Sequence, residues 1–179
     1  MRIIAGAARG RRLAAPPGAT TRPTADRARE GLFSAVMGEV EGARWLDLYA
    51  GSGAVGLEAL SRGASEVVLV ESHARAVAVI RENIARVGLD GAILAAAPVE
   101  RFLAGEPSPF DVVFADPPYA VSVEKTLRSL NDGGWLCPRA LIVVERATRS
   151  GEFGWPDGYV PVKARRYGEA TFWYGRLAA

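Results

Sequence analysis

Short apolar runs alternate with stretches of helical periodicity from about residue 44 onward. Five of these runs read as strands, at residues 45–49, 66–71, 92–97, 110–115 and 141–145. Between the second and third runs, apolar residues recur at helical spacing and Gly88 is placed to cap that helix. Because the runs are continuously apolar, we expect strands that are buried on both faces. The pattern predicts a Rossmann-like α/β fold with a mostly parallel sheet.

The two ends of the chain depart from this alternation. Residues 159–166 and 171–176 are aromatic and β-branched, which predicts a C-terminal antiparallel hairpin that closes a seven-stranded sheet. Residues 2–13 predict a small N-terminal hairpin, and Thr24 is placed to cap a helix that runs to about Gly38. We therefore expect a basic N-terminal hairpin and helix extension over residues 1–40 and a main domain over residues 41–179.

Composition and charge add a candidate binding surface. The chain has 179 residues, of which 49% are hydrophobic and 23% charged, as in one globular domain with a substantial core. The net charge is only +2, but residues 1–30 hold seven arginines against two acidic residues. Arg can fork onto phosphate, so this cluster is a candidate anion-binding surface; the alternative is a solvated face. The leading phosphate contacts are Arg9, Arg11 and Arg12, with Arg165 and Arg166 as a second, ambiguous pair.

Several other kinds of protein are disfavoured. Cys137 is the single cysteine and cannot form an internal disulfide, and one Cys with one His cannot supply a metal shell. His73 reads as a solvated residue and not as a catalytic base. No run approaches the roughly 18 apolar residues of a membrane span, and the first apolar run is too short for a signal peptide. We expect a cytoplasmic protein with no metal and no membrane contact.

A glycine motif falls between the first predicted strand and the next helix. Gly51, Gly53 and Gly56 form G-x-G-x-x-G, and Glu71 ends the following strand 20 residues after Gly51. Small residues let the backbone approach a ligand, and the N-terminus of the helix offers free N–H groups to an anion. Glu71 could accept hydrogen bonds from ribose hydroxyls. The glycines alone do not separate a nicotinamide cofactor from S-adenosylmethionine.

The sequence DPPY ends the fourth predicted strand, beside the first strand of a doubly wound sheet. An exocyclic base amine is a poor nucleophile, because its lone pair is delocalised into the ring. The Asp116 carboxylate and a backbone carbonyl fixed by prolines, beginning with Pro117, could accept both amine protons and favour a pyramidal nitrogen. Tyr119 could stack on a base that has left its helix. The motif therefore favours methyl transfer to a base amine.

These residues resemble the amino-methyltransferases, and the resemblance runs from end to end. Its specific segments are RIIAGAARGRRL, RPTADRAREGLF, LDLYAGSGAVGLEALSRGA and DPPY. The whole chain is similar to the RsmD-like family of bacterial 16S ribosomal RNA guanine-N2 methyltransferases. That resemblance implies a class I S-adenosylmethionine-dependent methyltransferase. It also implies 16S rRNA as the partner, in a partly assembled small subunit, and a monomeric enzyme.

The resemblance also assigns roles to single residues. It implies cofactor contacts by Arg22, Thr24, Asp47, Gly51, Gly53 and Glu71, amine positioning by Asp116 and Pro117, and stacking by Tyr119. Where related enzymes often place Asp or Asn to contact the cofactor adenine, this chain has Ala97, Pro98 and Val99. Three alternatives stay open: an N6-adenine methyltransferase, a nicotinamide-dependent oxidoreductase, and a noncatalytic RNA-binding protein on a methyltransferase scaffold.

Overall fold

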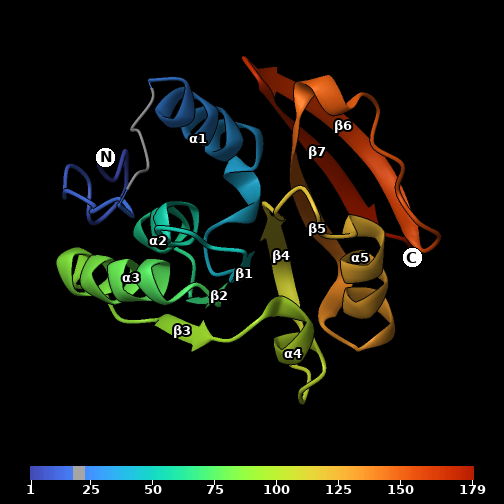
Figure 1. Cartoon of the computed structure of the whole chain (residues 1–179), viewed down its shortest axis with the longest axis horizontal. Helices are drawn as coiled ribbons and strands as arrows, with labels where there is room; N and C mark the ends of the chain where they lie inside the picture. The colour runs from blue at the N-terminus through green and yellow to red at the C-terminus, as the bar shows by residue number, and fades with distance from the viewer. Residues whose placement is uncertain (18–22) are drawn as a thin grey trace.

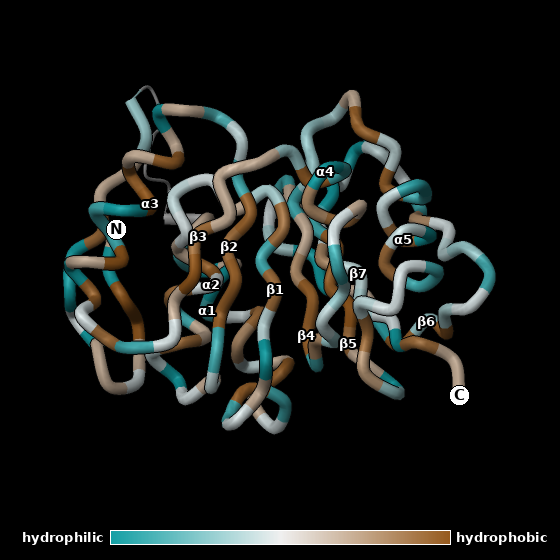
Figure 2. The backbone as a smooth tube through the Cα atoms, turned by 90° about the horizontal axis from the view of Figure 1, so that it is seen from below, coloured by the Kyte–Doolittle hydropathy of each residue, from teal (hydrophilic) through white to brown (hydrophobic). Residues whose placement is uncertain are grey.

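One sheet runs through the centre of the protein. The computed structural model describes residues 1–17 and 23–179, with the backbone alone at residues 23 and 24. In this part of the chain seven strands pair in the order β3-β2-β1-β4-β5-β7-β6 (Figure 2). Their bounds are β1 Arg44–Leu48, β2 Glu66–Glu71, β3 Ala92–Ala96, β4 Phe110–Ala115, β5 Leu136–Ala147, β6 Tyr159–Tyr167 and β7 Ala170–Leu177. The first five strands are parallel and β7 is antiparallel to both neighbours, which confirms the predicted Rossmann-like sheet and hairpin.

Helices cover both faces of the sheet (Figure 1). The helices α1 (Pro23–Ala35), α2 (Ala54–Ser61) and α3 (Ala74–Val87) pack with one set of strand side chains, which includes Trp45 and Phe114. The short α4 (Val99–Leu103) and α5 (Val123–Asp132) pack with the alternate set, which includes Leu46 and Val113. Successive strand residues enter opposite layers because side chains alternate across a strand. This is why the strands are continuously apolar (Figure 2).

The N-terminal segment packs against α2 and α3 and forms the predicted small hairpin. An antiparallel bridge joins Arg2 to Arg12, and the arms are linked by backbone hydrogen bonds from Ile3 N–H to the Arg11 carbonyl (3.0 Å) and from Leu13 N–H to the Met1 carbonyl (2.8 Å). A side chain holds the hairpin in place: the fully buried Glu58 carboxylate of α2 accepts hydrogen bonds from the backbone N–H groups of Ile4 (2.8 Å) and Ala5 (3.0 Å). Buried carboxylates need such partners, so Glu58 fixes the path of this segment.

Some predicted boundaries were wrong. The first helix begins at Pro23, so Thr24 lies inside its first turn and not at the cap; a proline suits this position because the first N–H has no partner within the helix. The helix ends at Ala35, and the 3-10 turn η1 (Met37–Glu39) follows. Strand β5 begins before the predicted residue 141, because an irregularity in its pairing with β4 accommodates Pro138. No helix in residues 1–17 and 23–179 is long and apolar enough to cross a membrane.

The C-terminal hairpin packs against α1 (Figure 1). A Cβ atom added to Gly31 would come within 2.3 Å of the Tyr167 ring, so only glycine allows this contact between helix and hairpin. In Figure 1, α1 and the outer end of the hairpin lie on either side of the carboxyl end of β4. The two elements therefore form walls around the strand ends where ligands bind in folds of this type.

Candidate active site

A cavity of about 680 Å³ opens at the carboxyl ends of β1, β4 and β5. Its walls come from α1, the glycine loop after β1, and the turn between β6 and β7. It lies where the strand order reverses between β1 and β4, which is the usual ligand crevice of a doubly wound sheet. Its volume is in the range of cofactor and small-molecule sites.

The loop after β1 is held in a conformation that brings its backbone to the cavity. Tyr49, Gly51 and Gly53 all have positive φ, at 59°, 60° and 80°. This is uncommon for a tyrosine and costs energy, as often happens at ligand sites. The nearly fully buried Asp47 carboxylate accepts a hydrogen bond from the Gly56 N–H at 2.9 Å, and burial raises the pKa of Asp47 well above its usual range. Asp47 thus fixes the first turn of α2 against β1.

Glu71 organises the neighbouring strand end. Its Oε1 accepts a hydrogen bond from the Gly51 N–H at 2.9 Å, and its Oε2 accepts from Ser72 and His73, each at 2.9 Å. A carboxylate can accept about four hydrogen bonds. Glu71 therefore stabilises the glycine loop and keeps one acceptor position on Oε1 for a ligand hydroxyl.

A buried cation lies on the opposite wall of the cavity. Arg29 of α1 is only 5% exposed, and burial lowers the pKa of its guanidinium. Its buried Nε lies 3.8 Å from a carboxylate oxygen of Glu58, and its Nη2 donates a hydrogen bond to the Arg2 carbonyl at 2.5 Å. Arg29 therefore ties α1 to Glu58 and to the N-terminal segment and adds positive charge to this wall. Beside it, the glycine loop lets a ligand approach the backbone and Glu71 offers an acceptor for a hydroxyl.

The DPPY residues lie beside this ligand crevice. Asp116 follows β4, is exposed to the cavity, and donates its backbone N–H to the Leu48 carbonyl of β1 at 3.4 Å. Tyr119 is 76% exposed, so its ring is free to stack on a flat ligand. Arg146 reaches over from β5: its Nη1 is 3.4 Å from the Pro117 carbonyl, and its guanidinium is 6.0 Å from the centre of the Tyr119 ring.

A second carboxyl group accompanies Asp116. Glu145 of β5 also lines the cavity, and its side chain hydrogen-bonds that of Asp116. Burial and the adjacent Asp116 charge raise the pKa of Glu145 to about 9, and burial also raises the pKa of Asp116. Two adjoining carboxyls cannot both ionise without repulsion, so the pair holds one shared proton near neutral pH. Glu145 and Arg146 were not predicted as site residues, although Glu145 is the last residue of the predicted strand 141–145 and lies in β5, beside β4.

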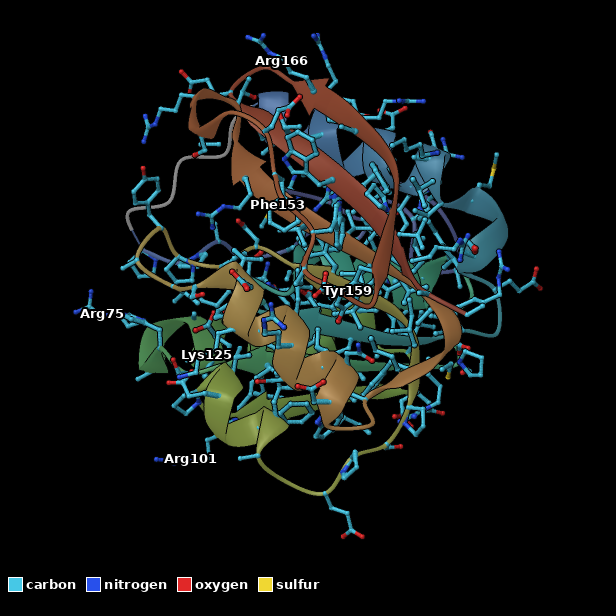
Figure 3. All side chains as sticks on the ribbon, turned by 90° about the vertical axis from the view of Figure 1, so that its right-hand side faces the viewer. Arg75, Arg101, Lys125, Phe153, Tyr159 and Arg166 are labelled. Atoms are coloured by element: carbon cyan, nitrogen blue, oxygen red, sulfur yellow. The ribbon has the colours of Figure 1, made fainter. Side chains whose placement is uncertain are left out.

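The remaining predicted site residues are dispersed. Arg22 lies outside the described residues, and Thr24 is described only by its backbone. Arg9, Arg11 and Arg12 are all exposed, and Arg11 also uses Nη1 to donate a hydrogen bond to the Val87 carbonyl at the end of α3. Arg165 and Arg166 are exposed near the outer end of the hairpin, where Figure 3 shows Arg166 at the edge of the molecule.

Other expectations concern residues away from the cavity. His73 is exposed before α3. In residues 1–17 and 23–179, no group of three His, Cys, Asp or Glu side chains could hold a metal ion.

The fold and the cavity are those of a Rossmann-like class I methyltransferase. The family model "Conserved hypothetical protein 95" matches residues 1–176. The ribosomal RNA small subunit methyltransferase D of Escherichia coli is 40% identical over 152 residues, 84% of this chain and 77% of that protein. The putative rRNA methyltransferase YlbH of Bacillus subtilis is 38% identical over 136 residues, 74% of each chain. The chain therefore belongs to this family of methyltransferases, which confirms the resemblance. The alternative of a nicotinamide-dependent oxidoreductase is excluded.

A solved structure supports the same assignment. The structure titled putative methyltransferase yhhF from Escherichia coli has a TM-score of 0.90 and 34% identity, and the match covers 100% of this chain and 98% of that one. The cofactor of this class is S-adenosylmethionine. The residues around the cavity fit it, because Glu71 has a free acceptor for a ribose hydroxyl, the glycine loop lets the backbone approach the ligand, and the positive charge of Arg29 lies on the opposite wall.

Proposed function

We propose that this protein transfers a methyl group from S-adenosylmethionine to the exocyclic N2 amine of a guanine in 16S ribosomal RNA. Relatives that carry the name ribosomal RNA small subunit methyltransferase D support rRNA methylation. The proposal depends on one observation: groups that suit a base amine and groups that suit the cofactor line the same cavity. Asp116 and the Pro117 carbonyl, which suit a base amine, line the same space as the glycine loop.

Cofactor contacts come from the loop and the strand ends. When bound, S-adenosylmethionine supplies an electrophilic methyl group. Gly51 and Gly53 let the backbone approach it, Asp47 fixes that loop, and Glu71 accepts a ribose hydroxyl. Arg22 and Thr24 belong to the segment that we propose covers the cofactor.

The base amine is oriented by a fixed acceptor pair. The Asp116 carboxylate and the Pro117 carbonyl each accept one hydrogen bond from the amine, so the nitrogen lone pair is directed away from both. Asp116 would take the proton that the amine loses when the methyl group leaves the cofactor sulfur and bonds to the nitrogen, and its raised pKa makes it a better base than a free carboxylate. Tyr119 stacks on the base, which has to leave any helix to enter the cavity.

The RNA contacts come from arginines outside the cavity. Arg9 and Arg12 are exposed on the N-terminal segment, and Arg165 and Arg166 on the hairpin, so they are available for phosphate. Arg11 has further donors besides the one bound to α3. We propose that the substrate is 16S rRNA in a partly assembled small subunit in the cytoplasm, and that the enzyme acts as a monomer. The second candidate is N6-adenine methylation, because DPPY suits any base amine.

A methylation assay tests this function. Purified protein and labelled S-adenosylmethionine are incubated with small subunits, or with naked 16S rRNA, from a strain that lacks the protein. We expect label in N2-methylguanosine, with faster transfer to the subunit. Label in N6-methyladenosine would support the second candidate, and no label in either RNA would refute both.

A further inference from the structure

Glu145 lies in a position fixed by the register of the sheet. Ala115, the last residue of β4, pairs with Val144 of β5, so Asp116, which follows β4, lies beside Glu145, the next residue of β5. Their carboxyl groups are hydrogen-bonded, and both line the cavity. Glu145 is only partly exposed, and the groups facing it are Asp116, Asp47 of β1 and its neighbour Arg146. The site for a base amine therefore contains an acid pair and not a single carboxylate.

The proton in this pair determines what Glu145 offers to a ligand. The shared proton leaves Asp116 as the charged acceptor, and Glu145 donates its O–H to it. A protonated carboxyl group still has a carbonyl oxygen that can accept a hydrogen bond. Glu145 therefore presents a fixed acceptor immediately beside the acceptor that we assign to the amine.

Guanine and adenine differ in the ring atom next to the exocyclic amine, which is the part of the base that would face Glu145. Beside its N2 amine guanine carries N1–H, a donor, whereas beside its N6 amine adenine carries N1, an acceptor. We propose that Glu145 determines base specificity, by accepting the N1–H of a guanine whose amine is held by Asp116 and the Pro117 carbonyl. This inference rests on the proposed function and names the residue that selects its base.

Two further features of the cavity agree with this assignment. With adenine, the Glu145 oxygen would face another acceptor, and sites that leave buried polar groups unpaired reject the wrong ligand strongly. The adjacent Arg146, at the same rim, brings a guanidinium that already spans Pro117 and Tyr119. It offers donors for the guanine O6, which lies beyond N1–H on the same edge of the base. Along the cavity, acceptors for the amine are followed by the Glu145 acceptor for N1–H and then by the Arg146 donor for O6. This order matches the edge of guanine.

The test combines a change in the enzyme with a change in the base. The target position is first mapped with the wild-type enzyme, and small-subunit RNA is then assembled by ligation with guanine or 2-aminopurine at that position. The analogue keeps the amine at C2 but has an acceptor at N1 and no O6. Single-turnover methyl transfer is measured for the wild type, Glu145→Met and Glu145→Gln. The matched control is Glu152→Gln, since Glu152 is exposed on the loop after β5.

We expect the wild type and the control to prefer guanine over 2-aminopurine by tenfold or more. Glu145→Met should lose most of its rate on guanine, and its preference should shrink by about tenfold, because the loss of O6 affects all variants alike. Glu145→Gln keeps a donor for Asp116 and a carbonyl acceptor, so it should retain most of both the rate and the preference. Binding of S-adenosylhomocysteine by each variant shows that its fold is intact.

The outcomes separate the two proposals. If the wild type makes no N2-methylguanosine, the proposed function fails before any variant is compared. If the wild type makes it but prefers guanine by less than threefold, or if Glu145→Met keeps the wild-type preference, Glu145 does not read the base. A structural role alone would lower the rates on both bases by the same factor.

Discussion

Removal of the Glu71 carboxylate tests how the cavity holds its cofactor. Three of the roughly four acceptor positions of Glu71 are filled by the backbone N–H groups of Gly51, Ser72 and His73. One position is left, so we expect one charge-assisted hydrogen bond to a ribose hydroxyl and not two. Such a bond contributes on the order of 1.5 to 3 kcal/mol. Glu71→Ala should therefore weaken binding of S-adenosylmethionine by about 10- to 150-fold.

The same substitution should cost less in stability than in affinity. Ser72 and His73 are exposed, so water replaces Glu71 there, and only the partly buried Gly51 N–H loses a partner, at a cost of about 1 kcal/mol. Titration calorimetry and thermal unfolding of the free protein measure the two effects. The control is Glu66→Gln at the other end of β2, where the carboxylate pairs with Arg44 at 2.8 Å. Unchanged affinity in Glu71→Ala, or an equal loss in the control, would refute the reasoning.

Three further predictions follow from the cavity, the basic segment and the wall between α1 and the hairpin. Asp116→Asn should lower the rate of single-turnover methyl transfer at least a hundredfold, which is roughly the effect of losing one preorganised charge, and should retain cofactor affinity. A rate near that of the wild type would exclude Asp116 from orienting the amine. Replacing Arg9 and Arg12 by Ala should flatten the slope of log affinity for RNA against log salt by about two units, whereas superimposable lines would place the RNA surface elsewhere. Gly31→Ala should displace the Tyr167 ring and cost about 1 to 3 kcal/mol in thermal unfolding. Gly38→Ala, whose added Cβ meets nothing within 4 Å, should cost less than half as much, and equal losses would contradict the packing argument.

The sheet could be predicted from local pattern because the central parallel strands β1, β2 and β4 are buried on both faces, whereas the edge strand β3 is only partly covered, with Ile93 49% exposed. Apolar runs of five or six residues then mark strands without ambiguity, and DPPY and the glycine loop could be placed at strand ends. The small N-terminal hairpin could be predicted as well, but its packing against the domain could not. Its position depends on Glu58, more than 50 residues away, whose carboxylate binds the backbone of the first arm.

The candidate site was predictable only where a motif marked it. Asp116 and Glu71 are part of recognisable spacings, whereas Glu145 and Arg146 enter the cavity through the register between β4 and β5. That register passes through an irregularity at the start of β5, which no local pattern marks. Arg29 likewise becomes significant only because folding buries it beside the cavity. Pairings between distant segments determine these positions.

The most direct test of the central claim is the modified-nucleoside content of 16S rRNA in cells. Ribosomal RNA from a strain that lacks this protein is digested and compared with wild type by mass spectrometry, with strains that express the wild-type chain or Asp116→Asn as complements. We predict that one N2-methylguanosine is lost, that the wild-type chain restores it, and that Asp116→Asn does not. An unchanged N2-methylguanosine content, with or without the loss of another methylated base, would contradict the account.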